Sequence, residues 1–229
     1  MKYWQVVPSQ CLLCHAWPCA DVLCPNCSQR FMLQPYRCSG CALALPGLSP
    51  EQRYCGACLR HPPIWREACA WVDYTYPWNL LITRWKFAQQ PPLARHFARW
   101  MSQTPQVQHL LEQADVIIPI PLAPERMRER GYNPAAQLAQ RLGKQACQPH
   151  TLLRVRNTPA QSGLTRKQRL RNLRHAFMVP AAQRHHIEGK TVLLIDDVMT
   201  TGATFAKASH CLLEAGAAHI HVLCMARTP

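Results

Sequence analysis

The spacing of apolar residues changes near position 70 of this 229-residue chain. Beyond that point, an alternating aromatic stretch at 70–76 predicts a strand. Short apolar runs predict three further, buried strands at 116–120, 191–195 and 219–225. Helical spacing is found at 78–87, 93–101, 134–142 and 205–215. The third of these helices has Asn133 as its cap and stops at Gly143. Strands that alternate with helices indicate an α/β fold with a parallel sheet flanked by helices.

The first 65 residues lack this periodicity and contain four C-x-x-C pairs. Two residues between cysteines let both sulfurs reach one tetrahedral ion, and a second pair completes a Cys₄ site. Read in order, the pairs form one group of Cys11, Cys14, Cys24 and Cys27 and another of Cys38, Cys41, Cys55 and Cys58. Fully ligated sites indicate structural Zn²⁺, one or two ions, rather than a catalytic metal. An interleaved pairing of the same ligands, or the use of Cys19 or His15 in the first site, stays open.

We therefore expect a small cysteine-rich module at 1–65 and an α/β domain at 66–229. The module is too small to bury much apolar area, so metal binding would supply folding free energy. Residues 1–5 do not resemble a secretory signal, and no run of about eighteen uncharged apolar residues predicts a membrane helix. These features indicate a cytoplasmic protein without membrane insertion, and they leave its oligomeric state open.

The charge of the chain is strongly positive, with a formal net charge of +14. Such a charge predicts attraction to polyanions, above all nucleic acid. Residues 131–187 contain no Asp or Glu, and their densest basic part holds Arg166, Lys167, Arg169, Arg171 and Arg174. This stretch is a candidate nucleic-acid surface, a flap over a nucleotide site, or a solvated basic face. Several aromatic side chains have the rings to stack on bases, although helical spacing favours a core role: Trp78, Trp85, Trp100 and Tyr132.

The strongest chemical signal is residues 192–204, Val-Leu-Leu-Ile-Asp-Asp-Val-Met-Thr-Thr-Gly-Ala-Thr. A buried strand here leads through two acids into a turn that opens a helix. Backbone N–H groups of residues 200–204 and the helix dipole would hold one phosphate. The carboxylates of Asp196 and Asp197 would accept hydrogen bonds from sugar hydroxyls and help hold Mg²⁺ through water. A strand-to-helix turn with acidic caps and no ligand is the alternative interpretation.

A second anion-binding segment follows the strand predicted at 116–120. Its basic side chains are Arg126, Arg128 and Arg130, and Gly131, Tyr132 and Asn133 come next. Arginines and amides at the end of a strand would hold a pyrophosphate group. Because Glu125 and Glu129 alternate with the arginines, a solvated helix turn with internal ion pairs stays an alternative.

Taken together, these segments resemble the ComF family over nearly the whole chain. The resemblance rests on the cysteine pairs, Ile118-Pro119-Ile120-Pro121-Leu122, Arg130-Gly131-Tyr132-Asn133, the stretch 161–177 and the loop 196–204. It implies a type I phosphoribosyltransferase fold with an N-terminal double zinc ribbon, and a site for 5-phosphoribosyl-1-pyrophosphate (PRPP) with Mg²⁺. Asp196 and Asp197 would be the catalytic residues. The residues implied to bind PRPP are Asp196, Asp197, Val198, Thr200, Thr201, Gly202, Ala203, Thr204, Arg130, Gly131 and Asn133. Pro134 departs from the family, where Gln is frequent, and it removes an N–H from the helix start.

Three functions follow from this resemblance. The first is a protein that binds PRPP and single-stranded DNA during DNA uptake, natural transformation or the use of external DNA, beside the DNA-translocation machinery. The second is an active phosphoribosyltransferase that replaces pyrophosphate with an unknown acceptor such as a nucleobase. The third is a DNA-binding regulator that senses PRPP. All three use the same residues, so the loop predicts a ligand and a fold but not a reaction.

Overall fold

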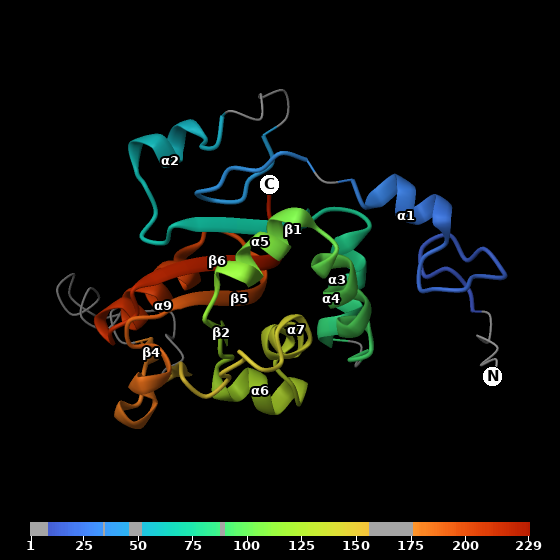
Figure 1. The fold of residues 1–229 in the computed structure, drawn as a ribbon. Helices are drawn as coiled ribbons and strands as arrows, with labels where there is room; N and C mark the ends of the chain where they lie inside the picture. The colour runs from blue at the N-terminus through green and yellow to red at the C-terminus, as the bar shows by residue number, and fades with distance from the viewer. Residues whose placement is uncertain (1–8, 34, 46–51, 88–89, 156–175) are drawn as a thin grey trace, which may run out of the picture.

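A four-stranded parallel sheet forms the centre of the computed structural model, which describes residues 9–33, 35–45, 52–87, 90–155 and 176–229. Its strand order is β1-β6-β5-β2 (Figure 1). The strands are β1 (Glu67–Asp73), β2 (Val116–Pro119), β5 (Thr191–Met199) and β6 (His219–Arg227). Beyond β2, a single parallel bridge joins Ile117 to Cys147. The expectation of a parallel sheet flanked by helices is confirmed.

Helices cover both faces of this sheet. The described elements are α1 (Pro25–Phe31), α2 (Gly56–Arg60), α3 (Trp78–Phe87), α4 (Leu93–Ser102), α5 (Pro105–Gln113), α6 (Pro124–Arg130), α7 (Pro134–Leu142), the 3₁₀ helix η1 (Ala181–His186) and α9 (Ala203–Glu214). Along β5, Leu193 and Ile195 face one layer, with α3, α4, α5 and α7. Val192 and Leu194 face the other layer, with α9. Burial on both faces explains why the strands are continuous apolar runs instead of alternating patterns.

Two sequence predictions differ from the structure in detail. The strand predicted at 70–76 is β1, which begins and ends three residues earlier. Tyr74 still donates its N–H to the carbonyl of Arg227, but Tyr76 is exposed and leads into α3. The second difference is α6, a full helix in the anion-binding segment, where only a helix turn was considered as an alternative. Pro124 in its first turn and Gly131 at its end, with φ of 77°, are ordinary helix boundaries.

A small antiparallel pair, β3 (Leu153–Arg154) and β4 (Phe177–Met178), lies beside the main sheet.

Trp78, Trp85 and Trp100 are buried between the helices, so the core interpretation of these side chains is confirmed. The N–H of Trp85 donates to Oε1 of Gln137, which joins α3 to α7. Among the described residues, no helix is both long and apolar enough to cross a bilayer.

The two cysteine groups lie at different places on the sheet. Figure 1 shows the first beyond α1 and the second between α2 and β1. Cys11, Cys24 and Cys27 belong to the same buried cluster as α3 and α4. The segment of the second group is bonded to the edge strand, because the N–H of Ala68 donates to the carbonyl of Ser39 at 2.7 Å. The division of the chain after residue 65 stays a prediction.

Candidate functional site

The turn between β5 and α9 is built around Gly202. Its φ is 78°, and it is the residue that caps α9. A Cβ at this position would lie 2.9 Å from Cε of Met199 and 3.2 Å from Cη2 of Trp65. The positive φ strains any other residue here, and an added Cβ would also require the end of Met199 and the Trp65 ring to shift. The N–H of Ala203 donates to Oγ1 of Thr201 at 3.3 Å, a weak bond that an anion at this helix start can replace.

Two adjacent carboxylates lie at the end of β5, directly before this turn. The N–H of Asp197 donates to Oδ1 of Asp196 at 2.8 Å. Nζ of Lys86, on α3, lies 2.7 Å from Oδ1 of Asp197, and both of these side chains are largely buried. Burial, and then the neighbouring charge of Asp197, raise the pKa of Asp196 to about 8. The pair thus has unlike environments, with one carboxylate neutralised by an ammonium group and the other favouring its protonated form.

A cleft of about 420 Å³ opens over these carboxylates. Four cationic side chains line it together with the acids: Lys86, Arg126, Arg130 and Arg154. Burial, followed by the charge of Arg126, lowers the pKa of Arg154. Nε of Arg154 is buried and has no hydrogen-bond partner among the described residues. Arg130 lies over the ring of Phe87 at 4.8 Å. This arrangement of carboxylates, threonines and guanidinium groups is suited to a phosphorylated polyol with a second anionic group.

The structure brings most of the predicted site residues together. Those that line the cleft are Asp196, Asp197, Val198, Thr200, Thr204 and Arg130. Thr201, Gly202 and Ala203 belong to the same turn. Asn133 has a structural task instead, because its Oδ1 accepts from the N–H of Ala135 and its Nδ2 donates to the carbonyl of Ile120. Gly131 ends α6. The candidate nucleic-acid residues at 166–174 lie outside the described residues.

Sequence reasoning missed two residues of the cleft, Lys86 and Arg154. Lys86 lies 111 positions before Asp197, on a helix whose pattern indicates only an apolar face. Arg154 lies in a strand of two residues, too short to be recognised. No local signal marks either side chain as functional, since their approach to Asp197 and Asp196 depends on the packing of α3 and β3 beside the sheet.

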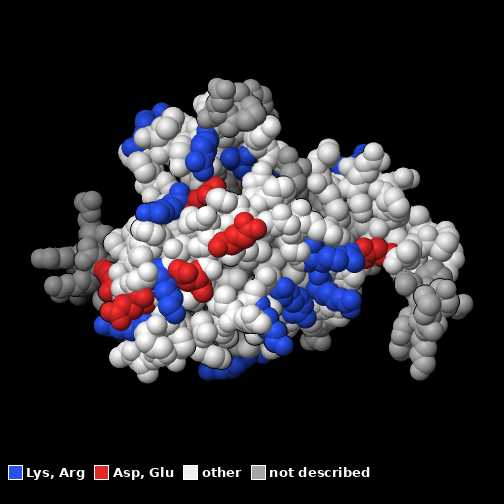
Figure 2. All heavy atoms as spheres, viewed as in Figure 1, with Lys and Arg blue, Asp and Glu red and all other residues white. Residues whose placement is uncertain are grey.

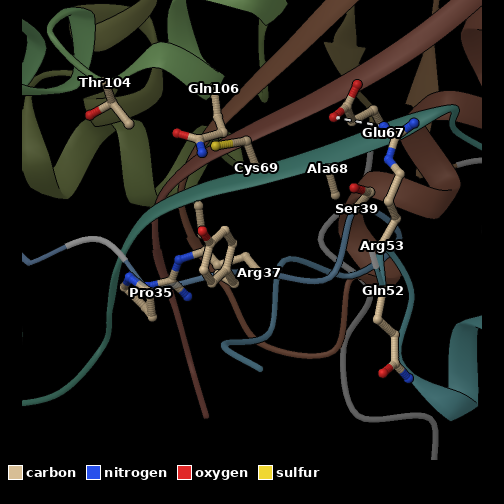
Figure 3. Close-up of a pocket in the computed structure, with 12 residues that line it drawn as sticks. Pro35, Arg37, Ser39, Gln52, Arg53, Glu67, Ala68, Cys69, Thr104 and Gln106 are labelled. Atoms are coloured by element: carbon tan, nitrogen blue, oxygen red, sulfur yellow. Dashed lines mark ion pairs between the residues drawn. The ribbon is translucent and has the colours of Figure 1, made fainter. Parts of the chain in front are cut away.

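A second cavity, of about 290 Å³, lies between β1 and the segment of the second cysteine group (Figure 3). Arg53 and Glu67 form an ion pair at 3.5 Å on one side of it, and Thr104, which precedes α5, and Gln106 of α5 line another side. It contains neither the acid pair nor the β5–α9 turn. The chemistry predicted from the sequence therefore belongs to the cleft over Asp196 and Asp197.

The eight paired cysteines form the two groups that sequential pairing predicts. In each group the four sulfurs lie within 4.8 Å of one another. The Sγ atoms of Cys14 and Cys24 are 3.6 Å apart, and those of Cys41 and Cys55 are 3.7 Å apart. A tetrahedral Zn²⁺ with Zn–S bonds of about 2.3 Å sets sulfurs about 3.8 Å apart, so both groups fit this ion. Cys19 is not a member of the first group, and its thiol donates to the carbonyl of Asp21.

A parallel sheet whose strand ends in two carboxylates, followed by a Thr-Thr-Gly turn that opens a helix, defines a phosphoribosyltransferase-type domain. The family model described as the phosphoribosyl transferase domain matches residues 86–229. This match includes the cleft, the turn and most of the sheet.

Known proteins are similar to this chain over nearly its whole length. The "DNA utilization protein YhgH" of Salmonella typhimurium is 33% identical over 231 residues, which cover 97% of this chain and 98% of that protein. The "Competence protein F" of Haemophilus influenzae is 34% identical over 211 residues, which cover 90% of each chain. The "Competence protein ComFC" of Bacillus subtilis is 40% identical over 103 residues, 45% of this chain and 40% of that protein. The chain therefore belongs to the ComF family of competence and DNA utilization proteins with a phosphoribosyltransferase domain.

Proposed function

We propose that this protein binds PRPP with Mg²⁺ in the cleft over Asp196 and Asp197, and that it acts on incoming DNA in the cytoplasm. The observation that carries the proposal is the composition of that cleft. Two carboxylates and three threonines line it together with four cationic side chains. PRPP needs all of these groups, because it joins a ribose with free hydroxyls to a 5′-phosphate and a pyrophosphate.

Each part of PRPP has a complementary group in this proposal. Asp196 and Asp197 accept hydrogen bonds from the ribose hydroxyls and help hold Mg²⁺ through water. The turn from Thr200 to Thr204 holds the 5′-phosphate with N–H groups, hydroxyls and the N-terminal end of α9. Arg126, Arg130 and Arg154 hold the pyrophosphate by charge-assisted hydrogen bonds. Lys86 supplies a further positive charge once an incoming Mg²⁺ shares Asp197 with it.

Isothermal titration of the full-length protein with PRPP and MgCl₂ tests this site. The wild-type protein is expected to bind, and Asp196→Asn is expected to weaken binding by about tenfold or more, because an amide is a poorer acceptor for two hydroxyls. Glu112→Gln, an exposed residue on α5, is the matched control and should bind as the wild type does. A wild-type protein that releases no heat with PRPP, and gains no thermal stability from it, contradicts the proposal.

The DNA part of the proposal is supported by the names of the related proteins and by the positive charge of this chain. Figure 2 shows Lys and Arg side chains gathered over the region of α4 and α7. Exposed arginines of these helices and of α3 are Arg84, Arg95, Arg99 and Arg141. The acid-free stretch 131–187 adds the basic residues from Arg166 to Arg174. We propose single-stranded DNA as the polyanion and the DNA-translocation machinery as the neighbouring partner.

The same cleft supports a second function, transfer of the phosphoribosyl group to an acceptor. In this function, the four cations that line the cleft would stabilise a leaving pyrophosphate while a positively charged sugar centre develops beside the carboxylates. A panel of nucleobases and related acceptors with PRPP and Mg²⁺ tests this function. Acceptor-dependent release of pyrophosphate that falls in Asp197→Asn supports transfer. A regulator that senses PRPP is recognised instead by a change of oligonucleotide affinity when PRPP is added.

We propose, finally, that the two cysteine groups hold structural Zn²⁺. Both have four thiols and, within the described part of the chain, no further Cys, His, Asp or Glu ligand, so four-coordinate Zn²⁺ would keep no open position for chemistry. Within the second group the thiols have unlike pKa values: burial raises that of Cys41 to about 11, whereas at Cys55 burial is outweighed by hydrogen bonds from the Cys58 backbone and neighbouring thiols, which bring its pKa to about 7. The assignment therefore rests on the geometry of the sulfurs and not on their ionisation.

A further inference from the structure

Two buried side chains join the second cysteine group to the candidate phosphate turn. Nε1 of Trp65 donates to the carbonyl of Gly40 at 2.7 Å. Nε of Arg227 donates to the carbonyl of Cys41 at 2.9 Å. Both carbonyls belong to the tight turn between Cys38 and Cys41, which carries two of the four thiols of this group. Trp65 and Arg227 are only 7% and 8% exposed, so these bonds are shielded from water.

The other ends of the same two side chains contact the turn after β5. Cη2 of Trp65 lies under Gly202, at 3.2 Å from the place of a Cβ, and the Trp65 ring packs edge-on against Phe205. Nη1 of Arg227 donates to the carbonyl of Met199 at 3.3 Å and also to the carbonyl of Thr228. The N–H of Thr228 donates to the same Met199 carbonyl at 3.0 Å. The turn is therefore supported at its beginning, by Arg227, and beneath its glycine, by Trp65.

This support depends on the shape of the cysteine turn. A Cβ on Gly40 would lie 2.8 Å from Sγ of Cys58, so the turn packs directly against the facing cysteine pair. Arg37 adds a further anchor, since its Nη1 donates to the carbonyl of Ala42 at 3.1 Å and pairs with Asp73 at 2.7 Å. A buried guanidinium such as that of Arg227 needs its carbonyl partners in place. If the four thiols separate, the carbonyls of Gly40 and Cys41 lose their fixed positions.

The first cysteine group has a different setting. It packs with α3 and α4, and near it Asp21 forms ion pairs with His96 and Arg99. Among the described residues, no hydrogen bond or ring contact joins Cys11, Cys14, Cys24 or Cys27 to residues 199–204. The two groups have the same ligands but different neighbours.

We propose that the second cysteine group, closed on its metal, fixes the conformation of the phosphate turn through Trp65 and Arg227, whereas the first group does not. Loss of metal from the second group would then lower the affinity for the phosphorylated ligand. This makes Trp65 and Arg227 positioning residues of the site. The inference rests on the proposed PRPP site for its effect on binding, but the coupling between the two segments is observable without a ligand.

The test compares Cys41→Ser with Cys14→Ser in the full-length protein, each expected to lose one zinc ion by native mass spectrometry. Hydrogen exchange of residues 199–204 is measured without ligand, and PRPP affinity by titration. In Cys41→Ser, exchange at 199–204 is expected to accelerate and PRPP affinity to fall by about tenfold, the equivalent of one buried hydrogen bond. Cys14→Ser should match the wild type in both measurements. Unchanged exchange at 199–204 in a folded Cys41→Ser overturns the coupling, even if PRPP does not bind to the wild type.

Trp65→Phe keeps an aromatic side chain and both metal sites but removes the N–H donor to Gly40 and the ring edge that contacts Gly202. It is expected to retain two zinc ions and still to show faster exchange at 199–204 and weaker PRPP binding. If Cys41→Ser does not fold, this variant tests the coupling between the second cysteine group and the phosphate turn in its place. If Trp65→Phe and Arg227→Gln both keep wild-type exchange at 199–204, the two side chains do not transmit the effect and the proposal fails. If the wild type shows no PRPP binding while exchange responds as expected, only the proposed function is lost.

Discussion

Nζ of Lys86 and Oδ1 of Asp197 lie 2.7 Å apart, although 111 residues separate them in the chain. The pair joins α3 to the end of β5 and lies in the same cleft as Asp196. A carboxylate beside a second, largely buried carboxylate is unfavourable by itself, and the ammonium group of Lys86 offsets this repulsion. The pair thus stabilises the two adjacent carboxylates at the end of β5 by balancing one of their charges.

Replacing Lys86 with methionine is expected to destabilise the protein. Asp197 would be left largely buried without its partner, which lowers the free energy of unfolding by about 2 kcal/mol. Urea unfolding at pH 7 measures the change. The double variant Lys86→Met/Asp197→Asn should recover part of the loss, because the unpaired charge is removed as well. Lys144→Met, at an exposed position, is the control. An equal loss in the single and double variants would contradict the pairing.

The pH dependence of stability should report on Asp196. Its pKa is raised to about 8 in the folded state, by burial and by Asp197, while the unfolded value is near 3.8. A raised pKa gives stability that is fully present below the unfolded value and is lost as pH rises toward the folded value. Asp196→Asn has no such loss. Urea unfolding is measured at pH 6 and at pH 8. Between these two values, the free energy of unfolding of Asp196→Asn should rise relative to that of the wild type by about 1–2 kcal/mol.

Only the difference between these two proteins is interpreted, because cysteine and histidine side chains titrate in both. The difference should grow steadily from pH 6 to pH 8. A difference that is constant over this range would show that Asp196 is already ionised at pH 6 in the folded protein.

Gly202→Ala is expected to damage the phosphate turn. The residue has φ of 78°, and an alanine Cβ would meet Met199 and Trp65. The backbone strain amounts to about 1 kcal/mol, and the steric conflict adds to it. PRPP titration should show a loss of about tenfold or more. Gly189→Ala is the matched control, since Gly189 has φ of 68° but open space around it. Equal PRPP affinities in the two variants would mean that the close approach at Gly202 has no role in binding.

Native mass spectrometry of the full-length protein is expected to find two zinc ions per chain. Cys19→Ser should keep both ions, because the Cys19 thiol bonds to the carbonyl of Asp21 and lies outside the first group. Removing zinc with a strong chelator should lower the melting temperature, since metal binding contributes folding free energy. One ion in the wild type, or the loss of an ion in Cys19→Ser, would refute the assignment of eight cysteines to two closed sites.

Single-stranded DNA binding should depend on the acid-free basic stretch. In the double variant Arg166→Glu/Lys167→Glu, affinity is expected to fall for all sequences, and the slope of log K against log salt to flatten by about one per lost phosphate contact. Arg60→Glu/Arg66→Glu makes the same change of charge at exposed positions that are not part of the proposed DNA surface. Fluorescence anisotropy with a labelled oligonucleotide at several salt concentrations measures both. Equal losses in the two variants would indicate attraction by net charge rather than by a defined strip.

The amino-acid sequence by itself determined the sheet, the phosphate turn and the cysteine groups. Apolar runs at β2, β5 and β6 indicate strands buried on both faces, whatever packs against them. The order of residues around Gly202 requires one backbone conformation, and each C-x-x-C pair places its two thiols side by side through local geometry. Signals of this kind depend on neighbours along the chain, so they can be read without a structure.

Tertiary structure alone decided which distant side chains share the cleft and which cysteine group supports it. Lys86 and Arg154 carry no local signal, because α3 and β3 bring them to Asp197 and Asp196 only through packing on the sheet. Arg227 ends the last strand and reads as an ordinary exposed charge, yet the sheet order places it between Met199 and Cys41. Contacts between residues far apart in the chain arise from the arrangement of layers, and no pattern of neighbouring residues encodes that arrangement.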